Sequence, residues 1–119
     1  MGSIAELIKI IGQKASSASE TLRIASTDQK NNALISIASQ IQQNTQFILD
    51  ANDLDLKAAR ENSIDDALLD RLMLNDERLD SIVEGLHQIS TLVDPIGKIS
   101  DFKERPSGIK IGKMMVPLG

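Results

Sequence analysis

The side chains suited to chemistry are few in this sequence, which contains one histidine, His87, and no cysteine. A serine or threonine nucleophile needs a nearby base. His87 is the one histidine that could serve as that base, and no pattern in the sequence places it with a nucleophile and a carboxylate in a catalytic triad. Transition metals usually need several His or Cys ligands, so a metal site is not expected. His87 follows Leu86 in a helical pattern, and we predict that it is a surface residue at the margin of the apolar stripe.

Carboxylates form three clusters, which we place at predicted helix junctions. The clusters are Asp50, Asp53 and Asp55; Asp65 and Asp66; and Asp76 and Glu77. Acidic residues stabilise helix N-termini by capping and through the helix dipole, so a structural role accounts for all three clusters. A calcium loop needs carboxylates at alternate positions, a central glycine and a distal glutamate, and no cluster has that complete pattern.

Two Gly-Lys pairs, Gly97-Lys98 and Gly112-Lys113, are too isolated to form a phosphate-binding loop. Such a loop needs several backbone N–H groups converging ahead of a helix, so we predict that both pairs form turns. The charged run Lys103–Arg105 is predicted to be a solvated connector, and Met114-Met115 to fill a strand. From the residues alone we predict no catalytic, cofactor-binding or metal-binding residue in this chain.

Composition narrows the class of protein further. Apolar residues make up 41% of the chain but aromatic residues only 2%, so a core must be aliphatic, which suits packed helices. The chain also lacks the stacking platforms of single-stranded nucleic-acid binders, and its net charge of -4 repels phosphate backbones. No apolar run approaches the roughly 20 residues that span a bilayer, and no signal-peptide pattern is present. We expect a cytoplasmic protein that binds neither nucleic acid nor membrane.

Apolar residues at helical spacing predict about five antiparallel helices within residues 1–94. The first stripe alternates steps of four and three residues, and Ser26–Gln29 then offers a capping box that starts the second helix. The first stripe consists of Ile4, Ile8, Ile11, Ala15, Ala18, Leu22 and Ala25. The second consists of Leu34, Ala38, Ile41, Thr45 and Ile48, widened by Ile37 and Leu49.

A third, shorter helix is predicted to follow, capped by Asn52 or Asp53 and running through Leu56. Asn62 is predicted to end this helix, because asparagine tolerates the left-handed conformation found at many helix C-termini. The next cap is predicted within Ser63–Asp66, and the helix that it starts contains three leucines: Leu68, Leu69 and Leu72.

The fifth helix is predicted to begin at Asn75 or Asp76. Its end is predicted at Asp94-Pro95, because the residue before a proline disfavours helical geometry. The apolar face of this helix consists of Leu79, Ile82, Val83, Leu86, Ile89 and Val93.

The last quarter of the chain has a different pattern. Residues 95–107 are predicted to be a polar connector, because they contain Gly97 and Pro106. Residues 108–119 are predicted to form a β-hairpin, with two short strands between Ile109 and Leu118 and a turn at Gly112-Lys113. A two-stranded hairpin is only marginally stable by itself and leaves an unpaired edge, through which we expect self-association.

Several short motifs occur in order from Ala51 onward. They are Ala51-Asn52 with Asp55, Ala67–Leu72, Leu74 with Arg78, Ile82, Gly85-Leu86, Asp94–Gly97, Ser107–Ile109 with Ile111, and Val116–Gly119. With these motifs the chain resembles, over about Ala15 to Gly119, the N-terminal region of the γ-glutamyl phosphate reductase family in the aldehyde dehydrogenase superfamily. Two positions depart from that family's usual pattern: Asn62 replaces a frequent glycine, and Lys113–Met115 replaces a stretch that often carries arginines.

The resemblance implies a larger parent enzyme that reduces γ-glutamyl phosphate to glutamate 5-semialdehyde with NADPH, in proline biosynthesis. It implies that a nucleotide domain and a catalytic domain with the cysteine nucleophile follow residue 119, so that this chain is the inactive N-terminal part of an aldehyde dehydrogenase-like α/β fold. Its implied partners are the rest of the parent chain and, through a bridging sheet at 108–119, another subunit. A self-contained helical adaptor, whose strands add to a partner's sheet, is the alternative that composition leaves open.

Overall fold

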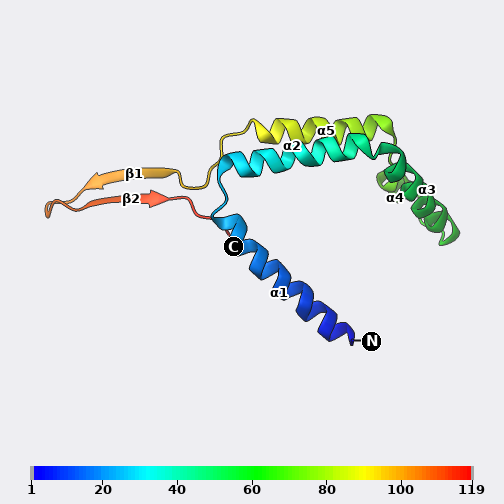
Figure 1. Ribbon diagram of the computed structural model, residues 1–119, viewed down its shortest axis with the longest axis horizontal. Helices are drawn as coiled ribbons and strands as arrows, with labels where there is room; N and C mark the ends of the chain where they lie inside the picture. Colours follow the sequence, from blue (N-terminus) through cyan, green and yellow to red (C-terminus); the bar gives the residue numbers. More distant parts are fainter. Residues whose placement is uncertain (1, 119) are drawn as a thin grey trace. The chain divides into compact units, whose positions relative to one another are not determined.

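The computed structural model describes residues 2–118, in which five helices precede one antiparallel pair of strands (Figure 1). The helices are α1 (Ile4–Arg23), α2 (Thr27–Gln43), α3 (Thr45–Glu61), α4 (Asp66–Leu72) and α5 (Asp76–Ser90). The strands are β1 (Ile99–Glu104) and β2 (Lys110–Met114). The predicted fold class, mainly helical with a hairpin near the C-terminus, is confirmed.

The described residues form two units. Residues 28–92 form a helical unit, and residues 2–27 together with 93–118 form the other. Within the second unit a side-chain bond joins two points that are distant in sequence, since the Thr27 hydroxyl donates to Asp94 Oδ2 at 2.9 Å. This bond connects the residue that starts α2 to the residue that precedes Pro95.

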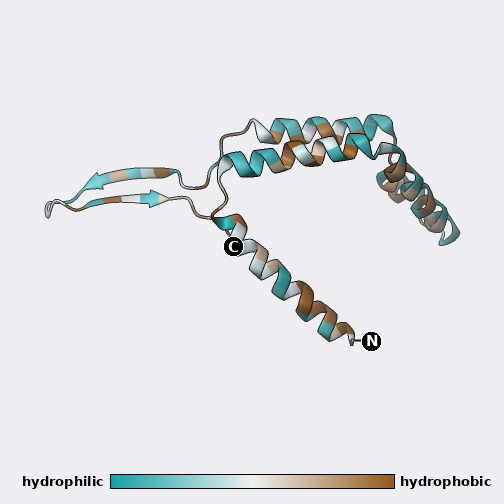
Figure 2. Cartoon of the chain, viewed as in Figure 1, coloured by the Kyte–Doolittle hydropathy of each residue, from teal (hydrophilic) through white to brown (hydrophobic). Residues whose placement is uncertain are grey.

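Helix α1 begins at a capping box that satisfies two backbone donors. The Ser3 hydroxyl accepts from the Glu6 N–H at 3.3 Å, while the Glu6 carboxylate accepts from the Ser3 N–H at 2.8 Å. The predicted first helix is confirmed, although no side chain within α1 is buried. Figure 2 shows that hydrophobic residues gather in its first half.

The boundary between α2 and α3 lies at Asn44, so the predicted second helix through Leu49 and the predicted cap at Asn52 or Asp53 are wrong. The Asn44 side chain donates to the Gln40 carbonyl at 2.8 Å. The Thr45 hydroxyl donates back to the preceding turn at 3.2 and 3.0 Å. Such side-chain bonds to the helix backbone bend a helix without removing its apolar stripe, which is why the stripe runs across the break.

Helix α3 ends at Glu61, so the predicted stop at Asn62 is confirmed, but the left-handed residue is Ser63, with φ 55°, and not Asn62. The Ile64 N–H donates to Ala59 O at 3.1 Å, and the Ser63 N–H to Arg60 O at 3.0 Å. These two bonds form a Schellman motif, in which the residue after the C-cap takes the left-handed conformation. Asn62 is the C-cap itself.

The caps of α4 and α5 agree with the sequence pattern. Asp65 accepts from the Leu68 N–H at 2.9 Å, and Asn75 accepts from the Arg78 N–H at 2.8 Å. Each bond satisfies one of the orphan donors at a helix start. Helix α5 ends at Ser90, ahead of the predicted stop at Asp94-Pro95.

The buried side chains all belong to the helical unit. Ala38 of α2, Leu56 of α3, and Leu79 and Val83 of α5 are the buried apolar residues among those described. The stripe predicted for α5 is only partly correct, because Val83 is buried whereas Ile82 is 43% exposed. The α5 residues that face inward are therefore spaced by four, at 79 and 83.

The hairpin begins earlier than predicted. Strand β1 lies within the predicted connector 95–107, and Gly112-Lys113, predicted to form the turn, lie inside β2. The turn is instead at Arg105–Gly108, where the Gly108 N–H donates to Arg105 O at 2.8 Å and Gly108 has φ 86°. A bulge between Ser100 and Lys103 interrupts the alternation of β1, which conceals this strand in the sequence.

Candidate functional site

The residues considered for chemistry lie apart in the structure. His87 is exposed on α5, as predicted. The described residues contain no group of three or more His, Asp or Glu side chains that could hold a metal ion. Asp50, Asp53 and Asp55 lie within α3 and not at a helix junction, so their predicted capping role is wrong. Asp50 instead accepts from Gln46 Nε2, one turn earlier, at 2.6 Å.

The two Gly-Lys pairs have different roles. Gly97 has φ 84° and donates to Met115 O at 2.9 Å, so it forms the bend that leads into β1, as predicted. Gly112 lies in a strand, where a Cβ atom would be 3.0 Å from both Ile99 Cγ2 and Phe102 Cδ2. Glycine at 112 therefore leaves space for two apolar side chains of β1.

A buried polar site joins α3 to the segment between α4 and α5. Asn52 is 6% exposed, and its side-chain amide donates to Leu72 O at 2.9 Å and accepts from the Leu74 N–H at 2.8 Å. Both ends of the amide are thus satisfied inside the protein, and the loop is held to α3. In the sequence, the feature that indicates burial of Asn52 is its position four residues before Leu56, on the same face of the helix.

Arg78, on α5, adds further hydrogen bonds to the same segment. We call the hydrogen bonds of Asn52 and Arg78 the joint. Its guanidinium donates to the Met73 carbonyl at 2.7 Å, to the carbonyl of Asp70, and to the Asp70 carboxylate at 2.9 Å. The Arg78 and Asp70 side chains are 37% and 65% exposed, so the ion pair contributes at most about 1 kcal/mol. The joint fixes the positions of helices and presents no nucleophile or base toward a cavity.

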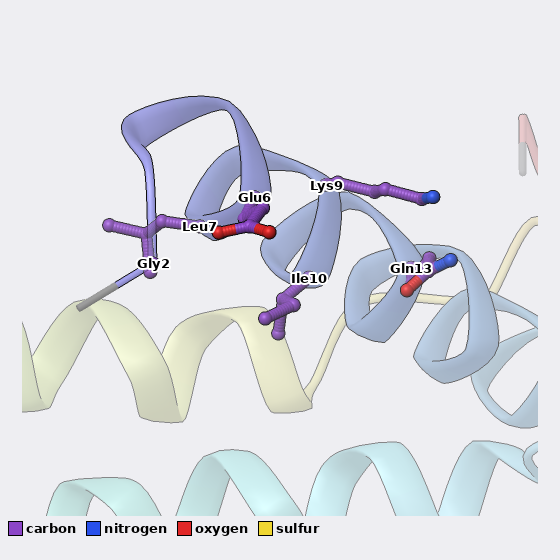
Figure 3. Close-up of a pocket in the computed structure, with 6 residues that line it drawn as sticks. All are labelled: Gly2, Glu6, Leu7, Lys9, Ile10 and Gln13. Carbon is purple, nitrogen blue, oxygen red and sulfur yellow. The ribbon is translucent and has the colours of Figure 1, made fainter.

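A shallow hollow on α1 is the other notable surface feature. Figure 3 shows the six residues that line it: Gly2, Glu6, Leu7, Lys9, Ile10 and Gln13. They all belong to α1 or to the residues just before it, and Leu7 and Ile10 are exposed. An apolar strip bordered by two charged side chains suits protein contact better than catalysis.

The two faces of the hairpin differ in chemistry. Directly paired residues share a face, so Ile99 and Met114 lie together, and Phe102 covers Gly112 on that side. Ser100 and Lys113 share the opposite face with Lys103 and Ile111. The first face is therefore apolar except for the paired Glu104 and Lys110 next to the turn, the other face combines Lys103 and Lys113 with Ile111, and neither has a buried side chain.

The described residues thus combine capped helices, a small aliphatic core, an exposed hairpin and dispersed ionisable groups. The chain is 53% identical, over all 119 residues, to the gamma-glutamyl phosphate reductase of Ruthia magnifica subsp. Calyptogena magnifica. The match covers 28% of that relative, so the chain spans less than a third of the relative's length. No family model matches the sequence.

Two solved structures match the fold. The gamma-glutamyl phosphate reductase of Thermotoga maritima superposes with a TM-score of 0.84 at 36% identity, covering 88% of this chain and 25% of that one. The enzyme of the same name from Saccharomyces cerevisiae has a TM-score of 0.83 at 27% identity, covering 90% and 27%. The chain is therefore homologous to part of gamma-glutamyl phosphate reductase, and the resemblance seen in the sequence is confirmed.

Proposed function

We propose that this chain is the helical and hairpin portion of a longer gamma-glutamyl phosphate reductase that reduces L-glutamyl 5-phosphate to L-glutamate 5-semialdehyde with NADPH. The supporting observation is the 53% identity to a protein of that name along all 119 residues. Proline biosynthesis is then the pathway and the cytoplasm the compartment. Within the described residues, none of the helices has the length and apolar character needed to cross a bilayer.

The proposed role of the chain is architectural. A reductase of this class needs a cysteine thiolate as nucleophile, and the sequence contains no cysteine. NADPH supplies the hydride when it is bound. The bonds of Asn52 and Arg78 fix α3, α4 and α5 relative to their connecting loop, and the apolar strip of α1 and the apolar face of the hairpin are surfaces for the remainder of the enzyme to cover.

The domain assignment belongs to this proposal. Residues 1–94 form the helical region, and the strands within 95–119 contribute to a sheet that joins subunits, so that the enzyme is a homo-oligomer. No catalytic, cofactor-binding or metal-binding residue is assigned to these 119 residues. The reading frame is proposed to continue into a nucleotide domain with a glycine-rich strand–helix unit and then into a catalytic domain with the cysteine.

Growth of a bacterial strain that lacks its own gamma-glutamyl phosphate reductase tests the proposal. The full reading frame should restore growth without proline, and residues 1–119 alone should not. A variant of the full reading frame that replaces the proposed cysteine with alanine is the matched control and should also fail.

Purified residues 1–119 should likewise give no turnover with L-glutamyl 5-phosphate and NADPH. Turnover by this chain alone would overturn the architectural role. Failure of the soluble full-length protein to restore growth would overturn the reductase assignment.

A further inference from the structure

The chain passes between its two units twice, once after Thr27 and once before Val93. Thr27 and Asp94 lie beside these two crossings, in the same unit, and their side chains are joined although 67 positions separate them in the sequence. The Thr27 hydroxyl donates to Asp94 Oδ2 at 2.9 Å, and we call this bond the clasp. The clasp therefore closes the long loop of chain that contains the helical unit.

The helical unit does not use the clasp to form its core. The four buried apolar side chains of the described residues, and the buried Asn52, all belong to residues 28–92. The partners of the Asn52 amide, Leu72 and Leu74, lie within the same range. Opening of the clasp removes none of these contacts.

On the hairpin side of the clasp, Asp94 makes a second bond. Its Oδ1 accepts from the Ile96 N–H at 3.0 Å, while its Oδ2 accepts from Thr27. A carboxylate that accepts from the N–H two residues later forms an Asx turn, which fixes the course of the backbone after it. One side chain thus holds both the start of α2 and the turn that precedes β1.

The segment after Asp94 connects this turn to the hairpin. The ring of Pro95 fixes its φ, and its carbonyl accepts from the Lys98 N–H at 3.3 Å. Gly97 has φ 84° and donates to Met115 O at 2.9 Å, and the Met115 N–H donates to Lys98 O at 2.9 Å. These last two bonds extend the ladder of β1 and β2, so the base of the hairpin begins three residues after Asp94.

We propose that the clasp is a conformational device that couples the order of the hairpin base to the start of α2. With the clasp closed, Asp94 holds the bend, and the bend holds the two ladder bonds at Met115. With the clasp open, the hairpin base opens more often while residues 28–92 stay folded. Neither described strand has a buried side chain that would oppose this opening. The inference rests on these bonds and not on the reductase assignment.

Amide hydrogen exchange of the 119-residue chain, followed by NMR, tests the proposal. Thr27→Val removes the hydroxyl at nearly constant volume. It should speed exchange of the Gly97 and Met115 amides about two- to tenfold, the range that loss of one exposed hydrogen bond gives. The Leu74 amide, which reports on the helical unit, should keep its rate. Thr27→Ser retains a hydroxyl and should restore the slow exchange.

Two further variants separate the clasp from a general effect of substitution. Thr91→Val removes another exposed hydroxyl, which donates to Gln88 O at 2.7 Å, and should leave the Met115 rate unchanged. Asp94→Ala removes both carboxylate oxygens and should speed Met115 exchange more than Thr27→Val does. In the Asp94→Ala background, Thr27→Val should have no additional effect, because the clasp is already lost.

Three results overturn the proposal. Thr27→Val leaves Gly97 and Met115 exchange unchanged; or it speeds Leu74 exchange by the same factor as Met115 exchange; or its effect persists in the Asp94→Ala background. The first result shows that the clasp does not hold the hairpin base, and the second that the substitution weakens the whole chain. The third shows that the Thr27 hydroxyl acts through another partner.

Discussion

Residues 28–92 and the β1–β2 hairpin use apolar side chains in opposite ways. In the helical unit, Ala38, Leu56, Leu79 and Val83 are buried, and a buried asparagine holds a loop to α3. In the hairpin, apolar side chains such as Phe102, 63% exposed, remain open on one face. The helical unit therefore contains a buried apolar core of its own, whereas the two-stranded hairpin lacks one and should be only marginally stable by itself.

The buried leucine of α5 offers the strongest way to test this difference. Leu79→Ala should lower the free energy of unfolding by about 2–4 kcal/mol, because Leu79 is 4% exposed and the lost methyl groups leave a cavity. Urea denaturation followed by circular dichroism measures the change. Leu7→Ala in α1, where the leucine is 56% exposed, is the control and should change stability by less than about 0.5 kcal/mol. Equal losses in the two variants would show that burial of Leu79 in the helical unit does not account for the effect.

Asn52 should give the next largest effect. Asn52→Ala leaves the Leu74 N–H and the Leu72 carbonyl without their partner, which should cost about 1–3 kcal/mol of unfolding free energy. Asn62→Ala removes an exposed side-chain bond to Ala58 O and should cost less, which makes it a matched control. If Asn52→Ala leaves the free energy of unfolding unchanged in urea denaturation, the joint does not hold the loop.

The cap of α5 should contribute less than the joint. Asn75→Ala should cost about 1 kcal/mol, because the Arg78 N–H loses its acceptor at the helix start. Asn75→Asp retains an acceptor and should recover most of the loss. If aspartate proves no better than alanine in the same urea series, the cap does not account for the effect.

Substitution of Gly112 should give the smallest change in the free energy of global unfolding, although its effect on the structure of the hairpin should be large. In Gly112→Ala the new Cβ would be 3.0 Å from Ile99 and Phe102 side-chain atoms, so the hairpin must shift or open. NMR chemical shifts of β1 and β2 should change, while the urea midpoint of the helices should not. A lowered midpoint would show that the hairpin stabilises the helical unit.

The sequence predicted those features that depend on local chemistry. The caps at Asp65 and Asn75 and the bend at Gly97 follow from residue types whose side chain or backbone freedom has a local use. The number of helices follows from the spacing of apolar residues. The similarity to part of gamma-glutamyl phosphate reductase followed from the order of the family motifs.

What the sequence could not predict depends on partners distant along the chain. Asparagine is a common N-cap residue, but the hydrogen-bond partners of Asn52 are 20 and 22 residues away along the chain. Strand β1 was missed because the bulge places Ile99 and Phe102, three residues apart, on one face and so breaks the two-residue period. At Gly112 the decisive neighbours, Ile99 and Phe102, belong to the other strand, so the sequence around Gly112-Lys113 resembles a turn.

Amide hydrogen exchange of the chain, kept dilute and at high salt, tests the comparison most directly. The Leu74 N–H, bound to Asn52, and the Met115 N–H, bound to Lys98 O at 2.9 Å, are hydrogen-bonded amides from the two regions. Leu74 should exchange only through opening of the helical unit, and Met115 at least about 100-fold faster through local opening of the hairpin. Equal protection of both amides would show that the hairpin is stable by itself and would contradict the account.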